Sequence, residues 1–287
     1  MKIAEILKMR MSFSFEVFPP KNEQPMEPLF EALSKLYYFK PDFISCTYGA
    51  GGTNKGRSLE ICKAVKQSGC EALAHFTCIG NTRADVKAFV ASYIALGIEN
   101  FLLLRGDFPA GWNGTHGDFA HAGELIAFIS SEFPDLHIGA AGYPEKHIDA
   151  PSFEADIAHL RNKQNNGAQF IMLQLCHDIT AYHRYVERVR RAGIHIPIIV
   201  GLMPVLARDA IIRMTVSNGC SIPAELASIL GKYSDDADSF RKAGMEYTVK
   251  QIHRYIAAGI DGLHIYTINK WRSVSEILKA SGIRIAQ

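Results

Sequence analysis

A single carboxylate lies near the end of the first predicted strand. Residues 12–21 read Ser-Phe-Ser-Phe-Glu-Val-Phe-Pro-Pro-Lys, which places Glu16 among alternating aromatic residues just before two prolines. Pro19 and Pro20 cannot continue a strand, so Glu16 lies near its carboxyl end. Burial disfavours the charged form of an acid and raises its pKa. We therefore predict a general acid that is partly protonated near pH 7; the alternative is a glutamate that points to solvent.

The other predicted strands also end in polar or glycine-rich segments. Each such residue alone has a structural explanation as a cap or a turn, but together they predict one active site at the carboxyl ends of the strands. The segments are Cys46-Thr47-Tyr48-Gly49-Ala50-Gly51-Gly52, His75 with Thr77, Arg105-Gly106-Asp107, Gly142-Tyr143-Pro144-Glu145 followed by His147, Gln174, Gly201-Leu202-Met203-Pro204 and Tyr266-Thr267-Ile268-Asn269.

A repeated pattern indicates the elements that carry these segments. A helical stretch, a glycine and a short apolar run follow one another five times, with the glycines at positions 69, 97, 167, 193 and 259. Glycine favours the left-handed turn at the end of a helix, and short aliphatic runs are typical of strands buried on both faces. The predicted strands are 12–18, 42–47, 71–77, 99–104, 137–142, 168–174, 196–201 and 262–267.

Helices are predicted between these strands from apolar residues that share one face. Leu29, Leu33 and Leu36 form one such face, and a second contains Met245, Val249, Ile252 and Ile256. Eight alternating units predict an α/β fold, a (β/α)8 TIM barrel that forms a single domain over residues 1–287. A doubly wound open sheet is the alternative.

The bulk composition excludes several function classes. The chain has 287 residues, of which 48% are hydrophobic and 21% charged, and its formal net charge is +2. This charge gives no electrostatic reason to expect nucleic acid or an anionic membrane as a partner. The six cysteines contain no C-x-x-C pair, so we expect reduced thiols and no metal site. No signal peptide or apolar run long enough to span a bilayer is evident, so we expect a cytoplasmic protein.

One glycine-rich segment resembles a phosphate-binding loop. Residues 51–58 read Gly-Gly-Thr-Asn-Lys-Gly-Arg-Ser, with Arg57 where that loop requires the lysine that reaches the phosphates. Asn54 stands where the third glycine of a dinucleotide-binding fingerprint would fall. We therefore predict neither a nucleotide triphosphatase nor a Rossmann-type dinucleotide site.

Five of the motifs, in order and spacing, resemble those of the methylenetetrahydrofolate reductases. They are Phe-Ser-Phe-Glu-Val-Phe-Pro-Pro-Lys, Thr-Tyr-Gly-Ala-Gly-Gly, Ala-His-Phe-Thr-Cys, Leu-Arg-Gly-Asp and Gly-Tyr-Pro-Glu-Lys-His, and the likeness extends from about residue 12 to residue 270. It matches the short, single-domain bacterial form. The resemblance implies an FAD-binding barrel of one-carbon metabolism and methionine biosynthesis. Such an enzyme reduces 5,10-methylenetetrahydrofolate to 5-methyltetrahydrofolate with NADH or NADPH by ping-pong hydride transfer, and a homo-oligomer is expected.

The resemblance also implies roles for individual residues. Glu16 would be the general acid that protonates N10 of the folate and opens its five-membered ring to an iminium cation. Asp107 would stabilise that cation and adjust the flavin, while Gln174, Met214 and Lys270 would contact the substrates. The implied FAD contacts are Thr47, Tyr48, Ala50, His75, Arg105, Gly106, Asp107, Ala122, Tyr143, His147, Ala150, Asp156 and Lys163.

The chain departs from the family pattern at four positions. Met214 stands in place of a phenylalanine, Asn162 in place of an arginine, Lys270 in place of an arginine and His121 in place of a tyrosine. Arg161, next to Asn162, is a candidate substitute for the missing cation. These departures leave open NADH, NADPH or a protein as the electron donor. The alternative functions are a folate- or flavin-binding subunit that takes electrons from a partner protein, and an FAD barrel of the proline-dehydrogenase type.

Overall fold

The chain folds into a closed barrel of eight parallel strands in a computed structural model, which describes residues 2–48, 55–108 and 111–283. The strand order around the barrel is the sequence order, and β1 pairs with β8 to close it. This confirms the predicted TIM barrel, and the open-sheet alternative is wrong. The strands are β1 Ser12–Val17, β2 Phe43–Cys46, β3 Glu71–Thr77, β4 Asn100–Leu104, β5 His137–Gly142, β6 Phe170–Leu173, β7 Ile198–Leu202 and β8 Gly262–Tyr266.

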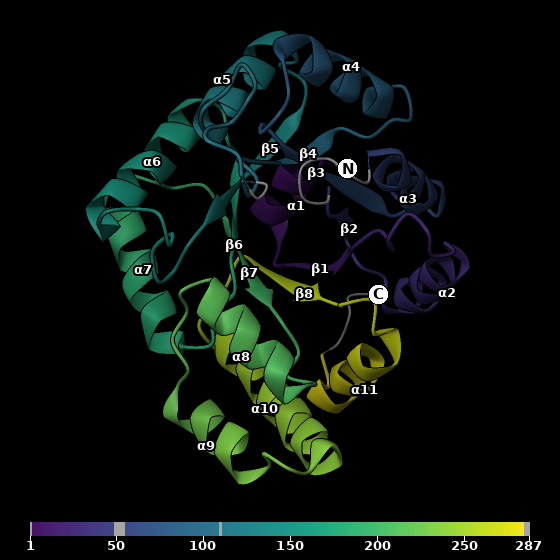
Figure 1. The fold of residues 1–287 in the computed structure, drawn as a ribbon, viewed down its shortest axis with the longest axis vertical. Helices are drawn as coiled ribbons and strands as arrows, with labels where there is room; N and C mark the ends of the chain where they lie inside the picture. The colour runs from purple at the N-terminus through teal and green to yellow at the C-terminus, as the bar shows by residue number, and fades with distance from the viewer. Residues whose placement is uncertain (1, 49–54, 109–110, 284–287) are drawn as a thin grey trace.

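Helices surround this barrel, as Figure 1 shows, while α1 lies near the centre of the ring of strands. The helices are α1 Ile3–Met9, α2 Glu27–Leu36, α3 Lys55–Gln67, α4 Arg83–Ile94, α5 Ala122–Glu132, α6 Phe153–Asn165, α7 Ile179–Arg191, α8 Arg208–Ser217, α9 Ala224–Lys232, α10 Ala237–Ala257 and α11 Trp271–Ser281, with a short 3-10 helix at Tyr37–Phe39. Between β7 and β8 the chain forms three helices, α8, α9 and α10, where a minimal barrel has one.

The predicted helix ends and helix faces are confirmed. All five predicted glycines have positive φ values, from 71° at Gly259 to 113° at Gly167, a conformation that favours glycine. Leu29, Leu33 and Leu36 are each no more than 3% exposed. On α10, Ile252 is fully buried and its three apolar neighbours on that face pack against the core.

The interior of the barrel is apolar in its lower layers. Phe43, Leu73, Leu102, Phe170, Met172 and Ile199 form a buried cluster with Ile3 and Leu7 of α1. Helix α1 therefore closes the end of the barrel at which the strands begin. The opposite end, where the strands stop, is left for the polar side chains that follow them.

Two further sequence predictions concern the thiols and the membrane. All six cysteines are free, and four of them are buried while Cys70 and Cys220 are half-buried, as expected for reduced thiols. Within the residues that the structure describes, no helix combines the length and apolar character needed to cross a bilayer.

Candidate active site

Glu16 points into the barrel at its open end, beside polar side chains from three other strands. Its Oε2 atom lies 3.4 Å from Ser45 Oγ on β2, 3.7 Å from His75 Nε2 on β3 and 3.7 Å from His264 Nε2 on β8. The Glu16 side chain is 18% exposed, so it is half-buried rather than directed to solvent. The predicted alternative of a solvent-facing edge glutamate is wrong.

The protonation state of Glu16 differs from the sequence prediction. Burial raises the pKa of the carboxyl group, but a hydrogen bond with His264, the charges of His75 and His264, and a hydrogen bond with Ser45 outweigh it. The net pKa of Glu16 is therefore lowered from its usual value of 4.5. The expectation of a partly protonated acid near pH 7 is wrong for the protein by itself, because the sequence does not reveal its neighbours.

His264 is a site residue that the sequence analysis missed. Its ring is fully buried, stacked on Phe43 with centroids 5.7 Å apart and an interplanar angle of 16°. Its Nδ1 atom lies 2.7 Å from Ser14 Oγ, and its Nε2 atom lies 3.2 Å from Ser45 Oγ. Alternation along Gly262-Leu-His-Ile-Tyr266 was the available signal, because it places His264 and Tyr266 on the same, inward face.

The loop after β8 fixes the end of the strand that carries Glu16. Thr267 donates two hydrogen bonds to the Glu16 carbonyl oxygen, from its backbone N at 3.1 Å and its Oγ1 at 2.6 Å. Asn269 Nδ2 donates to the Phe18 carbonyl oxygen at 2.9 Å. Ile268 and Asn269 both have φ values near 50°, which is uncommon for a β-branched residue such as isoleucine. The backbone of Glu16 is therefore held by a strained turn that these hydrogen bonds maintain.

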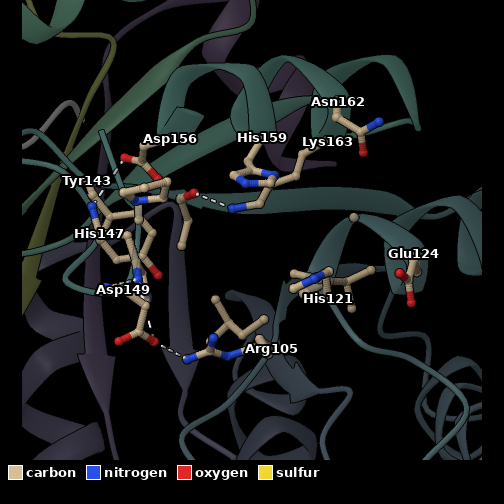
Figure 2. A pocket seen from close by; sticks show the side chains of 17 residues that line it. Arg105, His121, Glu124, Tyr143, His147, Asp149, Asp156, His159, Asn162 and Lys163 are labelled. Carbon is tan, nitrogen blue, oxygen red and sulfur yellow. Dashed lines mark hydrogen bonds and ion pairs between the residues drawn. The ribbon is translucent and has the colours of Figure 1, made fainter. Parts of the chain in front are cut away.

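A cavity of about 360 Å³ opens beside the ends of β4 and β5. Figure 2 shows its side chains approaching one space from the β4 end, the β5–α6 loop, α5 and α6. Seven of the predicted cofactor residues line it: Arg105, Ala122, Tyr143, His147, Ala150, Asp156 and Lys163. Its other lining residues include His121, Glu124, Asp149, His159 and Asn162.

The cations of this cavity are held by neighbouring acids and carbonyl groups. Arg105 Nη2 donates to Asp149 Oδ2 at 2.9 Å, and Lys163 Nζ donates to the Ala141 carbonyl oxygen at 3.2 Å. The Asp156 carboxylate accepts a hydrogen bond from the His147 backbone N at 3.3 Å. Arginine and lysine beside a cavity of this size suit an anionic ligand such as a diphosphate.

Burial shifts the titration of the inner cavity groups. It lowers the pKa of Lys163, which Asp156 partly opposes, and it raises the pKa of Asp156, which His147 and Lys163 partly oppose. Burial also raises the pKa of Tyr143 to about 12, so its hydroxyl remains a hydrogen-bond donor at neutral pH. Nearer the mouth, the hydrogen bond from Arg105 lowers the pKa of Asp149 and keeps that carboxylate ionised.

Strand β3 connects the cavity to Glu16. Thr77 pairs with Leu104, which lines the cavity, and His75 lies two residues earlier on the same inward face as Thr77. Within the described part of the chain, His75 Nε2 and Thr77 Oγ1 are buried without a hydrogen-bond partner. Gly106 packs closely here, since a Cβ atom on it would lie 2.9 Å from Thr77 Cβ. An extended ligand could therefore run from the cavity across these atoms to Glu16.

Of the predicted cofactor residues that follow the second strand, β2, those that the structure describes do not line the cavity. The Thr47 carbonyl oxygen accepts a hydrogen bond from Ser58 Oγ at 2.9 Å. The Tyr48 ring is buried against Phe76 and Phe89, with centroids 5.0 and 5.4 Å away, so that only its backbone is available to a ligand at the barrel mouth. Ala50 lies outside the described residues.

The predicted substrate residues are spread around the mouth of the barrel. Asp107 is exposed just after β4, and Gln174 is half-buried at the end of β6, where its Oε1 accepts from the Leu175 backbone N at 2.8 Å. Met214 on α8 is 39% exposed, and Lys270 is exposed at the start of α11. None of these four residues lines the cavity.

Two of the positions that depart from the family pattern, His121 and Asn162, line the cavity. Asn162 lines the cavity and Arg161 does not, so the structure does not bring Arg161 in as the substitute cation. Asn162 Oδ1 accepts a hydrogen bond from Asn166 Nδ2 at 3.0 Å. The rings of His121 and His159 face each other across the cavity with centroids 6.3 Å apart.

The segment that resembles a phosphate loop has a structural role at its arginine. Arg57 Nη1 donates to the carbonyl oxygens of Pro20, Lys21 and Gln24 at 3.3, 3.0 and 2.7 Å, and its Nη2 donates to that of Asn22. The guanidinium therefore holds the loop that follows β1. Residues 51–54 of this segment lie outside the described residues.

Comparison with known proteins gives a family match along almost the whole chain. The family model described as "Methylenetetrahydrofolate reductase" matches residues 2–282. The chain is 34% identical over 286 residues to "Methylenetetrahydrofolate reductase (NADH) 1" of Arabidopsis thaliana, a match that covers 95% of this chain and 48% of the relative. It is 30% identical over 276 residues to "5,10-methylenetetrahydrofolate reductase" of Escherichia coli, covering 96% and 92% respectively. The chain thus spans about half the length of the plant relative.

A solved structure shares the fold. A protein from Clostridium thermocellum, described as binding two copies of 5-methyl-5,6,7,8-tetrahydrofolic acid, superposes with a TM-score of 0.66 over 98% of both chains. Its sequence identity is 15%, so this likeness shows the architecture alone.

Proposed function

The chain belongs to the methylenetetrahydrofolate reductase family, and from this premise we propose that it reduces 5,10-methylenetetrahydrofolate to 5-methyltetrahydrofolate. The electrons would come from NADH or NADPH and pass through FAD in a ping-pong reaction. The observation that carries the proposal is Glu16, a half-buried carboxyl group at the open end of the barrel. It lies two strands away from His75 and Thr77 on β3, beyond which the cavity with Arg105 and Lys163 opens.

The residues present fit FAD on three structural grounds. Arg105 and Lys163 supply cations to a cavity large enough for part of a dinucleotide. His75 Nε2 and Thr77 Oγ1, which have no hydrogen-bond partner among the described residues, continue from it toward Glu16. Gly106 lets the β4 and β3 ends lie closer together than a side chain would allow. When bound, FAD would supply hydride chemistry, which no side chain of the protein provides.

The side chains at the mouth have distinct proposed roles in the folate half-reaction. Glu16 donates a proton to N10 of the folate, which opens the five-membered ring and leaves an iminium cation at N5. Asp107 lies exposed after β4, where its negative charge would favour that cation. The Gln174 amide would orient the pterin ring by hydrogen bonds, for which its amide nitrogen is available while Oε1 accepts from Leu175.

A protein electron donor is the second candidate for the reductive half-reaction. Three apolar side chains are exposed near the end of α8 and in the β5–α6 loop: Met214 at 39%, Val216 at 66% and Ile148 at 58%. An apolar surface of this kind is typical of contacts with another protein. The enzyme would then bind FAD and folate but fail to be reduced by soluble nicotinamides.

The anaerobic visible spectrum of the protein with FAD tests this proposal. Bleaching of the flavin bands on adding NADH or NADPH would support the nicotinamide-dependent reductase. A bound flavin that stays oxidised with both nicotinamides, yet is bleached by a reduced flavoprotein or ferredoxin, would favour the second candidate. No binding of FAD after reconstitution would overturn both.

A further inference from the structure

The proposed role of Glu16 as an acid requires a source for its proton. Glu16 must be protonated to act as a general acid, yet its hydrogen bonds and neighbouring imidazoles lower its pKa below 4.5. At neutral pH the carboxyl group would therefore be ionised before the substrate arrives. Another group close to Glu16 has to hold the proton that it will use.

Histidine is the side chain that most readily carries a proton near neutral pH, and two lie near Glu16. Burial lowers the pKa of His75 to about 4, so its ring is neutral at pH 7. Burial also raises the pKa of the Tyr266 hydroxyl and of the Cys46 thiol well above their usual values, and both stay uncharged. Among the described ionisable groups beside Glu16, His264 shares a hydroxyl neighbour with it, since Ser45 Oγ lies within reach of both side chains.

The environment of His264 holds its ring in one orientation, with a hydroxyl group at each nitrogen. Its two nitrogens lie against hydroxyl groups, Nδ1 at 2.7 Å from Ser14 and Nε2 at 3.2 Å from Ser45. Stacking on Phe43 and an edge contact with Tyr266 prevent the ring from turning. The apolar cluster closed by α1 occupies the barrel below, so exchange with water runs through the mouth, where Glu16 is 18% exposed.

We propose that His264 and Glu16 share one proton through the Ser45 hydroxyl, so that His264 stores the proton that Glu16 delivers to the substrate. The proposal rests on the geometry of the three groups: Ser45 Oγ lies 3.4 Å from Glu16 Oε2 and 3.2 Å from His264 Nε2, and it can relay a proton between them. It rests on the proposed function and deepens it, because it identifies how the acid of the folate half-reaction receives its proton.

The relay balances without any added reactant. The Ser45 hydroxyl passes its proton to Glu16 Oε2 while His264 Nε2 passes its own to Ser45 Oγ. One N–H bond and one O–H bond break, and two O–H bonds form. The ion pair becomes a neutral acid beside a neutral imidazole. After Glu16 has protonated the substrate nitrogen, one proton from solvent at the barrel mouth restores the starting state.

Nuclear magnetic resonance of the histidine side chains tests the sharing without any turnover. The signal of His264 is assigned by its loss in His264→Gln and followed against pH in the wild type and in Glu16→Gln. Neutralising the carboxylate should make His264 lose its proton at lower pH, because the ion pair that favours the proton is gone. An unchanged titration of His264 in Glu16→Gln would overturn the proposal, whether or not the protein reduces folate.

The folate half-reaction supplies a second test. His264→Gln keeps an amide that can bond to Ser45 but cannot carry the proton. Its rate of flavin reoxidation by methylenetetrahydrofolate should fall by about tenfold or more near pH 8 and approach wild type as the pH drops toward 5. A loss that is equal at every pH would mean a merely structural role and would contradict the proposal.

Two control variants accompany this measurement. In a Glu16→Gln background, His264→Gln should add no further loss, because both changes interrupt one path. His177→Asn is the matched control, since His177 is equally buried but faces Tyr247 instead of Glu16, and its pH profile should match wild type. If wild-type reduced flavin is not reoxidised by the folate at all, the proposed function fails, while the resonance experiment still decides the proton sharing.

Discussion

Replacing Glu16 with glutamine should separate the two half-reactions. Glutamine has nearly the same size and can keep the contact with Ser45 Oγ, which lies 3.4 Å from Glu16 Oε2. Within the described residues, no hydrogen bond joins the Glu16 side chain to a residue that lines the cavity. FAD affinity and the rate of flavin reduction by the nicotinamide should therefore change by less than about threefold, a difference below 1 kcal/mol.

The folate half-reaction of the same variant should be slowed far more. Loss of a positioned general acid typically reduces a rate by about 10²- to 10⁴-fold, or about 3 to 5 kcal/mol. The assay is anaerobic stopped flow, in which reduced enzyme is mixed with methylenetetrahydrofolate and the flavin absorbance is followed. Glu23→Gln, which removes an exposed carboxylate from the loop after β1, is the control and should behave as wild type. Reoxidation of Glu16→Gln within about threefold of the wild-type rate would refute the assignment of the acid.

The other predictions concern charge near the folate, in the cavity and in the core. Asp107→Asn should slow flavin reoxidation by about fivefold and disturb FAD affinity by less than that, because an exposed charge contributes only about 1 kcal/mol; loss of FAD without a kinetic defect would contradict this. Lys163→Met should weaken FAD binding by about 10- to 100-fold in a fluorescence titration, as expected for a charged hydrogen-bond donor, whereas the exposed Lys242→Met should not. Burial lowers the pKa of His75 and of His177 from 6.5 to about 4, so the unfolded chain binds more protons between these values and stability should fall as the pH drops from 6.5 to 4. Each histidine contributes up to about 3 kcal/mol to the decrease in the free energy of unfolding over this pH range. Urea unfolding at pH 7 and 4.5 should therefore show a smaller loss of stability in His177→Asn than in the wild type; an equal loss would count against this explanation.

The barrel could be predicted from the sequence because its signals are local. A glycine at each helix end, such as Gly167, and a short apolar run after it depend only on neighbouring residues. The predicted strand 168–174 exceeds the observed Phe170–Leu173 by three residues, Ala168, Gln169 and Gln174, which lie outside the residues that pair with β5. Boundaries set by pairing with another strand are not visible in one sequence.

The site could be predicted only where it depends on position along a strand. Glu16 was found because a strand end is a local feature, but its lowered pKa depends on His75 and His264, which are 59 and 248 residues away in the sequence. His264 was missed because it lies within a strand, where a buried histidine has no sequence sign of a partner. The Tyr48 ring turns outward to Phe76, and only packing decides that direction.

The product of the folate half-reaction tests the proposed reductase activity most directly. The protein is loaded with FAD, reduced anaerobically and mixed with one equivalent of 5,10-methylenetetrahydrofolate. We expect the flavin to be reoxidised and 5-methyltetrahydrofolate to form in equal amount. A flavin that stays reduced, with the folate recovered unchanged, would contradict this expectation.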